Sequence, residues 1–349
     1  MNANVTAEPT RIGAHESPAE SIVAPSPGAA SMVDAIRVIA SVLIIWIHVP
    51  QSDAMIATTI VGRFAVPFFV FAAVFFATQN GLQKRERTVR QTIGSRFRRI
   101  YAPFVVWSVI YVVFKGVKLL VVPNQPNDFP GWEVVFVGTA YHLWFLPFIF
   151  FATVAAFAGA RSTAAERLRE AGLFVALLGV VCCSARTDYW QVDDGFKYAF
   201  QTMPAALWAF GFATIAHQTS IGRLQTLISP VAFFIGVLSL LAVVAVGRNV
   251  LFENVAGMSL FVWAYWRKDR QPLPAWISHL AKLSFGIYLS HMLFIKVAEA
   301  LIQRTGLGAS VGLDIALMCG VTAVSIAACA SYREARKRFK NTKLGLLFL

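Results

Sequence analysis

Residues 33–50 have the sequence VDAIRVIASVLIIWIHVP, an apolar stretch long enough to cross a bilayer. It carries Asp34 and Arg37 near one end and His48 near the other. A charged side chain at the centre of a membrane helix costs about 3 kcal/mol, so such residues usually serve a function. Arg37 and His48 are 11 residues apart, which in an α-helix places them on one face and ~16 Å apart along the axis. One helix thus presents a cation at one depth and an imidazole at another.

The composition places the chain among polytopic membrane proteins. Of its 349 residues, 57% are apolar and only 14% are charged, and the mean hydropathy is +0.62; soluble domains are about 25% charged. The net charge of +13 lies in short segments between apolar stretches, without a basic face that carries aromatic residues, so no nucleic-acid partner is expected. The four cysteines show no metal-ligand or disulfide pattern, and we expect no metal.

The order of apolar and polar segments predicts an all-α protein with about ten transmembrane helices. Residues 1–31 lack the basic start of a signal peptide and predict a disordered cytoplasmic tail. Residues 32–331 form the predicted membrane domain, and residues 332–349 form a basic cytoplasmic tail. The predicted helices cover residues 33–50, 61–78, 100–122, 139–160, 171–185, 198–216, 227–246, 250–266, 277–301 and 310–331.

The positive charges of the connections set the predicted orientation. With the N-terminus inside, the cytoplasmic connections and the C-terminal tail hold 20 Lys and Arg residues, whereas the opposite connections hold 4. Lys and Arg concentrate on the cytoplasmic side of membrane proteins. Both termini are therefore expected in the cytoplasm. The cytoplasmic connections are residues 79–99, 161–170, 217–226 and 267–276.

Polar residues from four further helices fall at a depth similar to that of His48, in the outer half of the predicted bundle. One interpretation is that each is interfacial and extends its polar end to the lipid headgroups. The interpretation that we favour is a polar chamber that opens outward, because five helices contribute to it. The residues from the other helices are Arg63, His142, Glu253, Tyr288 and His291.

Arginines precede the third predicted helix on the inner side. Residues 84–99, KRERTVRQTIGSRFRR, place Arg96, Arg98 and Arg99 against the membrane surface. A guanidinium has forked donors that match phosphate, so these side chains could bind a polyanion. The positive-inside rule accounts for them equally well.

Five motifs in order resemble those of the acyltransferase-3 family, integral-membrane O-acyltransferases that modify bacterial surface carbohydrates. The first helix has the family's pattern of Arg, ten residues and His, and the second, RFAVPFFVFAAVFFA, is similar to its RxxVPxFFxxSG stretch with Ala72–Ala73 in place of Ser-Gly. The motif residues are Arg37 and His48, Arg63 and Pro67, Arg96 and Arg99 (RxxR), His142–Leu146 (HLWFL), and Tyr288–His291 (YLxH).

The resemblance implies an enzyme of the bacterial inner membrane that transfers an acyl group, typically acetyl. The donor would be cytoplasmic acetyl-CoA or another acyl-CoA, used as a co-substrate with no bound cofactor. The acceptor would be a carbohydrate hydroxyl near the outer face, on a surface polysaccharide or a lipid-linked glycan, and the remaining partner is membrane lipid. The subgroup is expected to lack an extra C-terminal extracytoplasmic domain.

The resemblance also implies roles for the motif residues. His48 and Arg37 are the predicted catalytic residues, with His48 as the base for the sugar hydroxyl or as a transient acyl carrier. Arg96 and Arg99 would bind the phosphates of acyl-CoA. The predicted acceptor-binding residues are Arg63, His142, Glu253, Tyr288 and His291, of which His142 could equally be a structural hydrogen-bond donor.

Two alternatives use the same polar groups. A proton-coupled transporter or flippase-like carrier would employ the intramembrane His, Glu and Arg residues as a relay. A non-catalytic membrane subunit of a polysaccharide-export assembly would need no chemistry. The absence of an evident internal repeat and the ordered motifs favour the enzyme.

Overall fold

The computed structural model describes residues 31–49, 52–83, 86–121, 131, 133–184, 194–218, 225–267 and 273–339. Every element over these ranges is a helix, so the prediction of an all-α fold is confirmed. The predicted N-terminal tail, except Ser31, lies outside the described residues, as do residues 340–349 of the predicted C-terminal tail.

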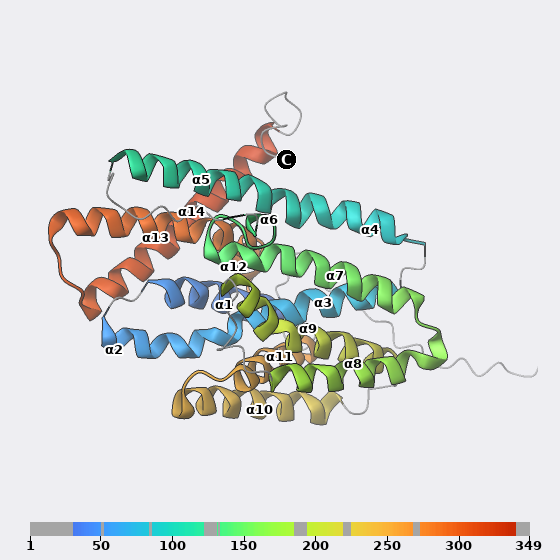
Figure 1. The fold of residues 1–349 in the computed structure, drawn as a ribbon. Coiled ribbons are helices and arrows are strands. Elements are labelled where there is room, and N and C mark those ends of the chain that lie inside the picture. The colour runs from blue at the N-terminus through green and yellow to red at the C-terminus, as the bar shows by residue number, and fades with distance from the viewer. Residues whose placement is uncertain are drawn as a thin grey trace, which may run out of the picture.

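The helices follow one another through short connections (Figure 1). Those labelled η are 3₁₀-helices except η2, which is a π-helix. In order they are α1 (Met32–His48), α2 (Asp53–Ile56), η1 (Ala57–Phe64), α3 (Ala65–Gln83), α4 (Val89–Arg96), η2 (Phe97–Tyr101), α5 (Ala102–Val121), α6 (Val134–Val137), η3 (Tyr141–Trp144), α7 (Phe145–Ser162), η4 (Ala165–Arg167), α8 (Leu168–Cys183), α9 (Asp194–Gln218), α10 (Gln225–Val246), α11 (Val250–Trp266), α12 (Ala275–Ala281), α13 (Ser284–Thr305) and α14 (Val311–Phe339).

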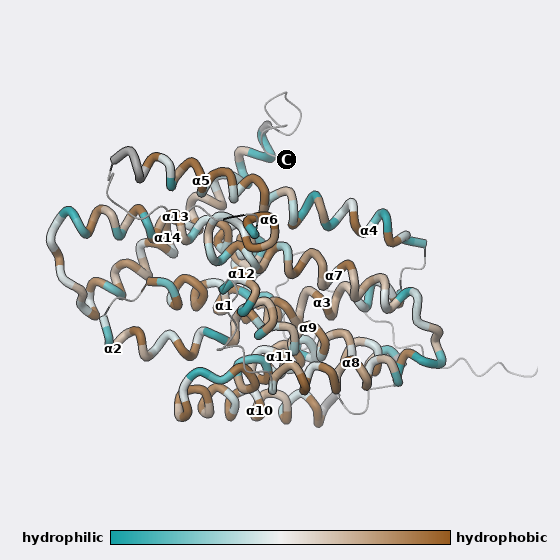
Figure 2. The backbone as a smooth tube through the Cα atoms, viewed as in Figure 1, coloured by the Kyte–Doolittle hydropathy of each residue, from teal (hydrophilic) through white to brown (hydrophobic). Residues whose placement is uncertain are grey.

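Seven helical stretches among the described residues are long and apolar enough to span a membrane. The three other predicted spans fall in α1, α8 and α11, which have 17, 16 and 17 residues, so the number ten stays a prediction. Large apolar side chains are exposed along α5, α8, α10 and α14, as expected of helices in contact with lipid, and apolar residues dominate α5 and α10 in Figure 2. The seven stretches are Asp53–Gln83, Val89–Val117, Tyr141–Ser162, Asp194–His217, Leu227–Val246, Ser284–Thr305 and Val311–Arg338.

The connections between helices lie in two groups, one at each end of the helix bundle. The α10–α11 and α13–α14 connections lie at the left of Figure 1, and the α3–α4 and α7–α8 connections lie at the right. The charge distribution predicts the first pair outside and the second pair inside. The grouping agrees with that prediction, and the direction in which the bundle crosses the membrane stays a prediction.

Several predicted helix boundaries are wrong, since the helices predicted from residues 61 and 100 lie in helical stretches that begin at Asp53 and Val89. The segment 277–301 is not one helix, because a turn at Lys282 and Leu283 separates α12 from α13; the Leu283 N–H donates to the Leu280 carbonyl at 2.9 Å. The last helix does not end at residue 331 but continues to Phe339. Residues 332–339 are mostly polar and include the Glu334–Lys337 ion pair, which suits a helix in water. The end of the apolar run therefore predicts where the helix leaves the membrane, and the helix itself continues beyond that point.

Pro67 and Pro147 lie inside continuous helical stretches, Asp53–Gln83 and Tyr141–Ser162. Each is the third residue of the α-helix that follows a 3₁₀-helix in its stretch. Pro204 lies inside α9 and does interrupt its hydrogen bonds.

The side chain of Asn254 repairs this interruption. Its Oδ1 accepts from the Ala205 N–H at 3.2 Å, and its Nδ2 donates to the Gln201 carbonyl at 2.8 Å. These are the two groups that an unbroken helix would join directly. Asn254 is 1% exposed, so the amide of α11 is built into the backbone of α9.

Helix α3 packs against α7, α9 and α11 and contributes three buried phenylalanines, Phe68, Phe71 and Phe75, to the core. Phe71 and Phe75 are fully buried, and each lies 5.2 Å from the ring of Phe261 in α11. The approach of α11 to α3 is closest at Gly257, where an added Cβ would lie 2.6 Å from the Phe68 backbone nitrogen. The small residue that permits close helix contact here is therefore on α11.

Candidate active site

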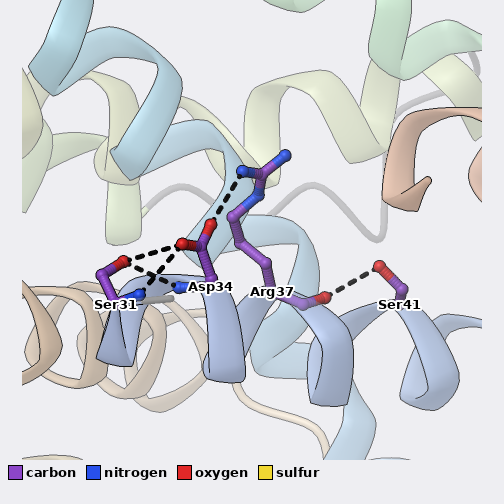
Figure 3. A network of polar contacts seen from close by, with 4 residues as sticks. All are labelled: Ser31, Asp34, Arg37 and Ser41. Carbon is purple, nitrogen blue, oxygen red and sulfur yellow. Dashed lines mark hydrogen bonds and ion pairs between the residues drawn. The ribbon is translucent and has the colours of Figure 1, made fainter. Parts of the chain in front are cut away.

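Helix α1 begins with a capping box. The Ser31 hydroxyl accepts from the Asp34 N–H at 3.3 Å, and the Asp34 carboxylate accepts from the Ser31 N–H at 3.1 Å (Figure 3). The pattern Ser-x-x-Asp before an apolar run is a sequence signal for this cap. Asp34 is thus first of all a helix-starting residue.

Arg37 pairs with Asp34 one turn earlier. Its Nη1 lies 3.4 Å from Asp34 Oδ1, and Figure 3 shows the guanidinium reaching away from α1 with one end turned to the carboxylate. A guanidinium has five N–H donors, so this pair leaves donors for a ligand. The Arg37 side chain is 36% exposed and is accessible to one.

His48 is the last residue of α1, and its ring meets Tyr141 of η3. The two rings are edge to face with centroids 5.2 Å apart, and His48 Nδ1 lies 2.5 Å from Tyr141 Oη. The Trp46 indole, which donates to Thr58 Oγ1 at 3.0 Å, ties this end of α1 to η1. Both members of the pair are open to the outside of the bundle, because His48 is half-buried and Tyr141 is 50% exposed.

Two buried histidines lie behind His48. His291 of α13 stacks on His48 with ring centroids 5.5 Å apart, and His142 of η3 meets His291 edge to face at 5.2 Å. They are 0% and 3% exposed. Enclosure by protein does not fit the alternative that these two rings reach lipid headgroups. Tyr288 completes the cluster through its hydroxyl, which donates to the His142 carbonyl.

The main chain holds His291 in one tautomer. Its Nδ1 lies 2.7 Å from the Tyr288 carbonyl oxygen and 3.2 Å from that of Ile287. Carbonyl oxygens only accept, so Nδ1 carries the proton and the lone pair of the neutral ring is on Nε2. This Nε2 is buried with no hydrogen-bond partner among the described residues.

The ring of His142, unlike that of His291, has no hydrogen bond to the main chain in the described structure. The Leu289 carbonyl lies near its ring and accepts from the Tyr111 hydroxyl at 2.9 Å, but no hydrogen bond of ordinary geometry reaches either ring nitrogen within the described ranges. The cluster therefore contains buried imidazole nitrogens that the surrounding protein does not satisfy. His48, His142 and His291 do not form a metal-binding group in the described part of the chain.

Arg63 and Glu253 lie beside this cluster. Arg63 of η1 is close enough for its charge to act on both His48 and Glu253, although no ion pair joins Arg63 to Glu253 in the described structure. Arg248, which sequence reasoning missed, belongs to the same group: its Nη2 donates to Gln201 Oε1 at 2.6 Å and its guanidinium lies 5.3 Å from the Tyr198 ring centre.

Arg96 and Arg99 lie apart from the histidines. Arg96 ends α4 and Arg99 lies in the π-helix η2, and α4 is at the opposite end of the molecule from α2 (Figure 1). Arg87 is near enough to act electrostatically on Arg96. A capping box between Thr88 and Gln91 starts α4, so the predicted connection 79–99 is partly helical. The three arginines form a basic patch at this end.

The structure thus brings together His48, His142, Tyr288 and His291, with Arg63 and Glu253 beside them, and separates them from Arg96 and Arg99. Sequence reasoning missed Tyr141, although it directly precedes the HLWFL motif. It also missed Met292, whose Sδ lies 3.7 Å from the Tyr141 hydroxyl. Both residues adjoin predicted site histidines in the sequence, and this adjacency is the only signal that pointed to them.

Comparisons with known proteins identify the domain. The acyltransferase domain of the acyltransferase-3 family matches residues 32–331, nearly the whole chain. An amino-acid racemase of Enterococcus faecalis is 31% identical over 128 residues, which are 34% of this chain and 17% of the racemase, so the chain spans a small part of that relative. No solved structure matches the chain significantly. The chain therefore belongs to the acyltransferase-3 family, and its long apolar helices are those of a multi-pass membrane protein.

Proposed function

We propose that this enzyme moves an acyl group, acetyl in the first instance, from cytoplasmic acyl-CoA to a hydroxyl of an extracytoplasmic or lipid-linked carbohydrate in the bacterial inner membrane. The observation that carries the proposal is the His48 site. His48 alone in the histidine cluster is partly exposed, and it hydrogen-bonds Tyr141 at 2.5 Å. An exposed imidazole backed by buried polar groups suits proton transfer at a site that admits a substrate.

The chemistry requires a base because a sugar hydroxyl is a poor nucleophile near neutral pH. As the hydroxyl oxygen attacks the thioester carbonyl, its proton passes to His48, the new C–O bond forms and the C–S bond breaks. The imidazolium then returns the proton to the departing thiolate, which leaves as CoA thiol. In the alternative route His48 attacks first and carries the acyl group before the hydroxyl receives it.

The basic groups away from His48 are the proposed donor site. Arg96 and Arg99 would bind the phosphates of acyl-CoA, because guanidinium groups match the geometry of phosphate oxygens. Arg37 lies on α1 ~16 Å from His48 along the axis and would contact the pantetheine arm or a phosphate. This arrangement supports transfer along α1 from a donor site to an acceptor site.

The acceptor side is assigned to the groups around His48. Arg63, which is charged and near His48, and Glu253, which is near Arg63, would bind sugar hydroxyls. His142, Tyr288 and His291 are too deeply buried to lie on a glycan surface. We assign them to the relay of protons behind His48.

The test uses purified protein in lipid with labelled acetyl-CoA and a set of surface glycans. Labelled ester should form on a glycan and His48→Ala should abolish it, while His279→Ala, a histidine of the separate helix α12, should not. Retained transfer in His48→Ala would remove His48 as base and as carrier. Movement of substrate across the membrane without ester would favour a carrier.

A further inference from the structure

We propose that Tyr141 is a positioning residue that sets the tautomer of His48. Its hydroxyl oxygen accepts the Nδ1 proton of His48, which leaves the Nε2 lone pair to take the proton of the acceptor hydroxyl. The inference rests on the proposed function. It starts from the contact of 2.5 Å between Tyr141 Oη and His48 Nδ1.

Met292 offers the phenol proton of Tyr141 an acceptor other than His48. A phenol has one proton and can donate it once, but its oxygen can also accept. The Sδ of Met292 lies 3.7 Å from Tyr141 Oη and provides an acceptor for the phenol proton. With that proton on the sulfur side, the oxygen lone pairs face His48, so His48 Nδ1 is the donor.

Contacts on two sides hold the His48 ring. Tyr141 meets its edge, with the two planes at 81°, and His291 covers its face, with the planes at 21°. His291 is itself held by the Tyr288 carbonyl at 2.7 Å. The direction of Nε2 therefore follows from neighbours that are anchored to the main chain, as a base requires for efficient transfer.

Tyr141 takes the place that a carboxylate holds in a serine hydrolase triad. The charged groups that act on His48 are Arg63 and Lys296, both cationic, and Lys296 is paired with Glu299 at 2.8 Å. The phenol oxygen is a neutral acceptor for Nδ1–H. This hydrogen bond remains when Nε2 of His48 takes the proton of the acceptor hydroxyl. Because a neutral acceptor stabilises the imidazolium less than a carboxylate does, we expect an effect smaller than the ~10⁴-fold of the triad aspartate.

The first experiment compares Tyr141→Phe with the wild type in lipid. Phe keeps the edge contact with His48 and removes only the oxygen, so the melting temperature should stay unchanged. We expect kcat to fall about 10- to 100-fold with KM for acetyl-CoA unchanged, which corresponds to the loss of one hydrogen bond to a charged group. The matched control is Tyr101→Phe, whose hydroxyl donates to the Val135 carbonyl at 3.1 Å, and its kcat should not change. A wild-type kcat in Tyr141→Phe would overturn the proposal.

The second experiment observes the tautomer directly. Solid-state NMR of protein labelled with ¹⁵N-histidine, with His48 assigned by its loss in His48→Ala, should show protonated Nδ1 and unprotonated Nε2 in the wild type. Tyr141→Phe should shift or mix these signals. Protonated Nε2 in the wild type would overturn the proposal. This measurement needs no substrate, so it tests the tautomer independently of the proposed function. Absence of ester formation in the transfer assay would contradict the proposed function alone.

Discussion

The imidazole of His48 lies on that of His291, with ring centroids 5.5 Å apart and planes 21° apart. One ring ends α1 and is partly exposed, whereas the other is fully buried in α13. A fully buried ring does not touch a glycan. Whatever His291 contributes to acyl transfer therefore acts through His48.

We predict that His291→Phe gives a stable but slow enzyme. Phe preserves a flat ring against His48 but removes Nε2, which is buried and has no partner in the described structure. Loss of the unsatisfied Nε2 is favourable, but Phe also loses the Nδ1 hydrogen bond to the Tyr288 carbonyl, worth about 1 kcal/mol, so the melting temperature should stay near that of the wild type. If Nε2 relays protons, kcat should fall at least about tenfold.

Steady-state transfer and thermal melting in the same lipid check this prediction. The control is His217→Phe, a histidine in the last turn of α9, which should keep its activity. Full activity in His291→Phe would leave His291 with the stacking role alone.

We predict that Asn254→Ala destabilises the protein by about 2–4 kcal/mol, because it leaves the Ala205 N–H and the Gln201 carbonyl without their side-chain partner. Thermal melting in detergent measures the effect. The control is Asn80→Ala: Asn80 Nδ2 donates to the Phe76 carbonyl at 2.7 Å on a less buried part of α3, and the change should be within about 0.5 kcal/mol.

A double-mutant cycle with Pro204→Ala tests the cause of that loss. Alanine at 204 restores the N–H and lets α9 close its own hydrogen bonds, so the effect of Asn254→Ala should shrink by at least about 1 kcal/mol in this background. Additive effects would show that Asn254 stabilises the bundle by packing and not by repairing α9.

We predict that Arg96→Ala with Arg99→Ala weakens acyl-CoA binding about 100- to 10,000-fold, because each arginine would lose a charged hydrogen bond to phosphate worth about 1.5–3 kcal/mol. Calorimetric titration with CoA at two salt concentrations measures the affinity, and the salt dependence should fall with the two charges. Arg333→Ala and Arg336→Ala, on α14, form the control pair. Unchanged affinity would leave Arg96 and Arg99 with only a topogenic role.

Part of the site was predictable from spacing within one helix. Arg37 and His48 lie on α1 as the 11-residue separation requires, and Tyr288 and His291 share one turn of α13, because helical geometry fixes relations at short range. The role of Asp34 in starting α1 also lay within reach, since the Ser-x-x-Asp pattern carries it.

Contacts between helices were not predictable in this way. The sequence does not distinguish Asn254 within the apolar helix α11, and its function appears only where α11 meets the break at Pro204. Tyr141 and Met292 likewise acquire a role only because η3 and α13 bring them to the end of α1. Hydropathy records how apolar a segment is and carries no information about which neighbour it faces.

The sequence alone determined the all-helical membrane class, the family motifs and the residues that carry the proposed chemistry, because hydropathy, loop charge and short-range spacing are local properties. The tertiary structure alone decided which of these residues meet. It stacks His48 on His291, hydrogen-bonds His48 to Tyr141 and places α4, which ends at Arg96, at the opposite end of the molecule from α2. The reason is physical: distances between helices depend on packing among residues far apart in the chain, such as the contact of Gly257 with the backbone of α3.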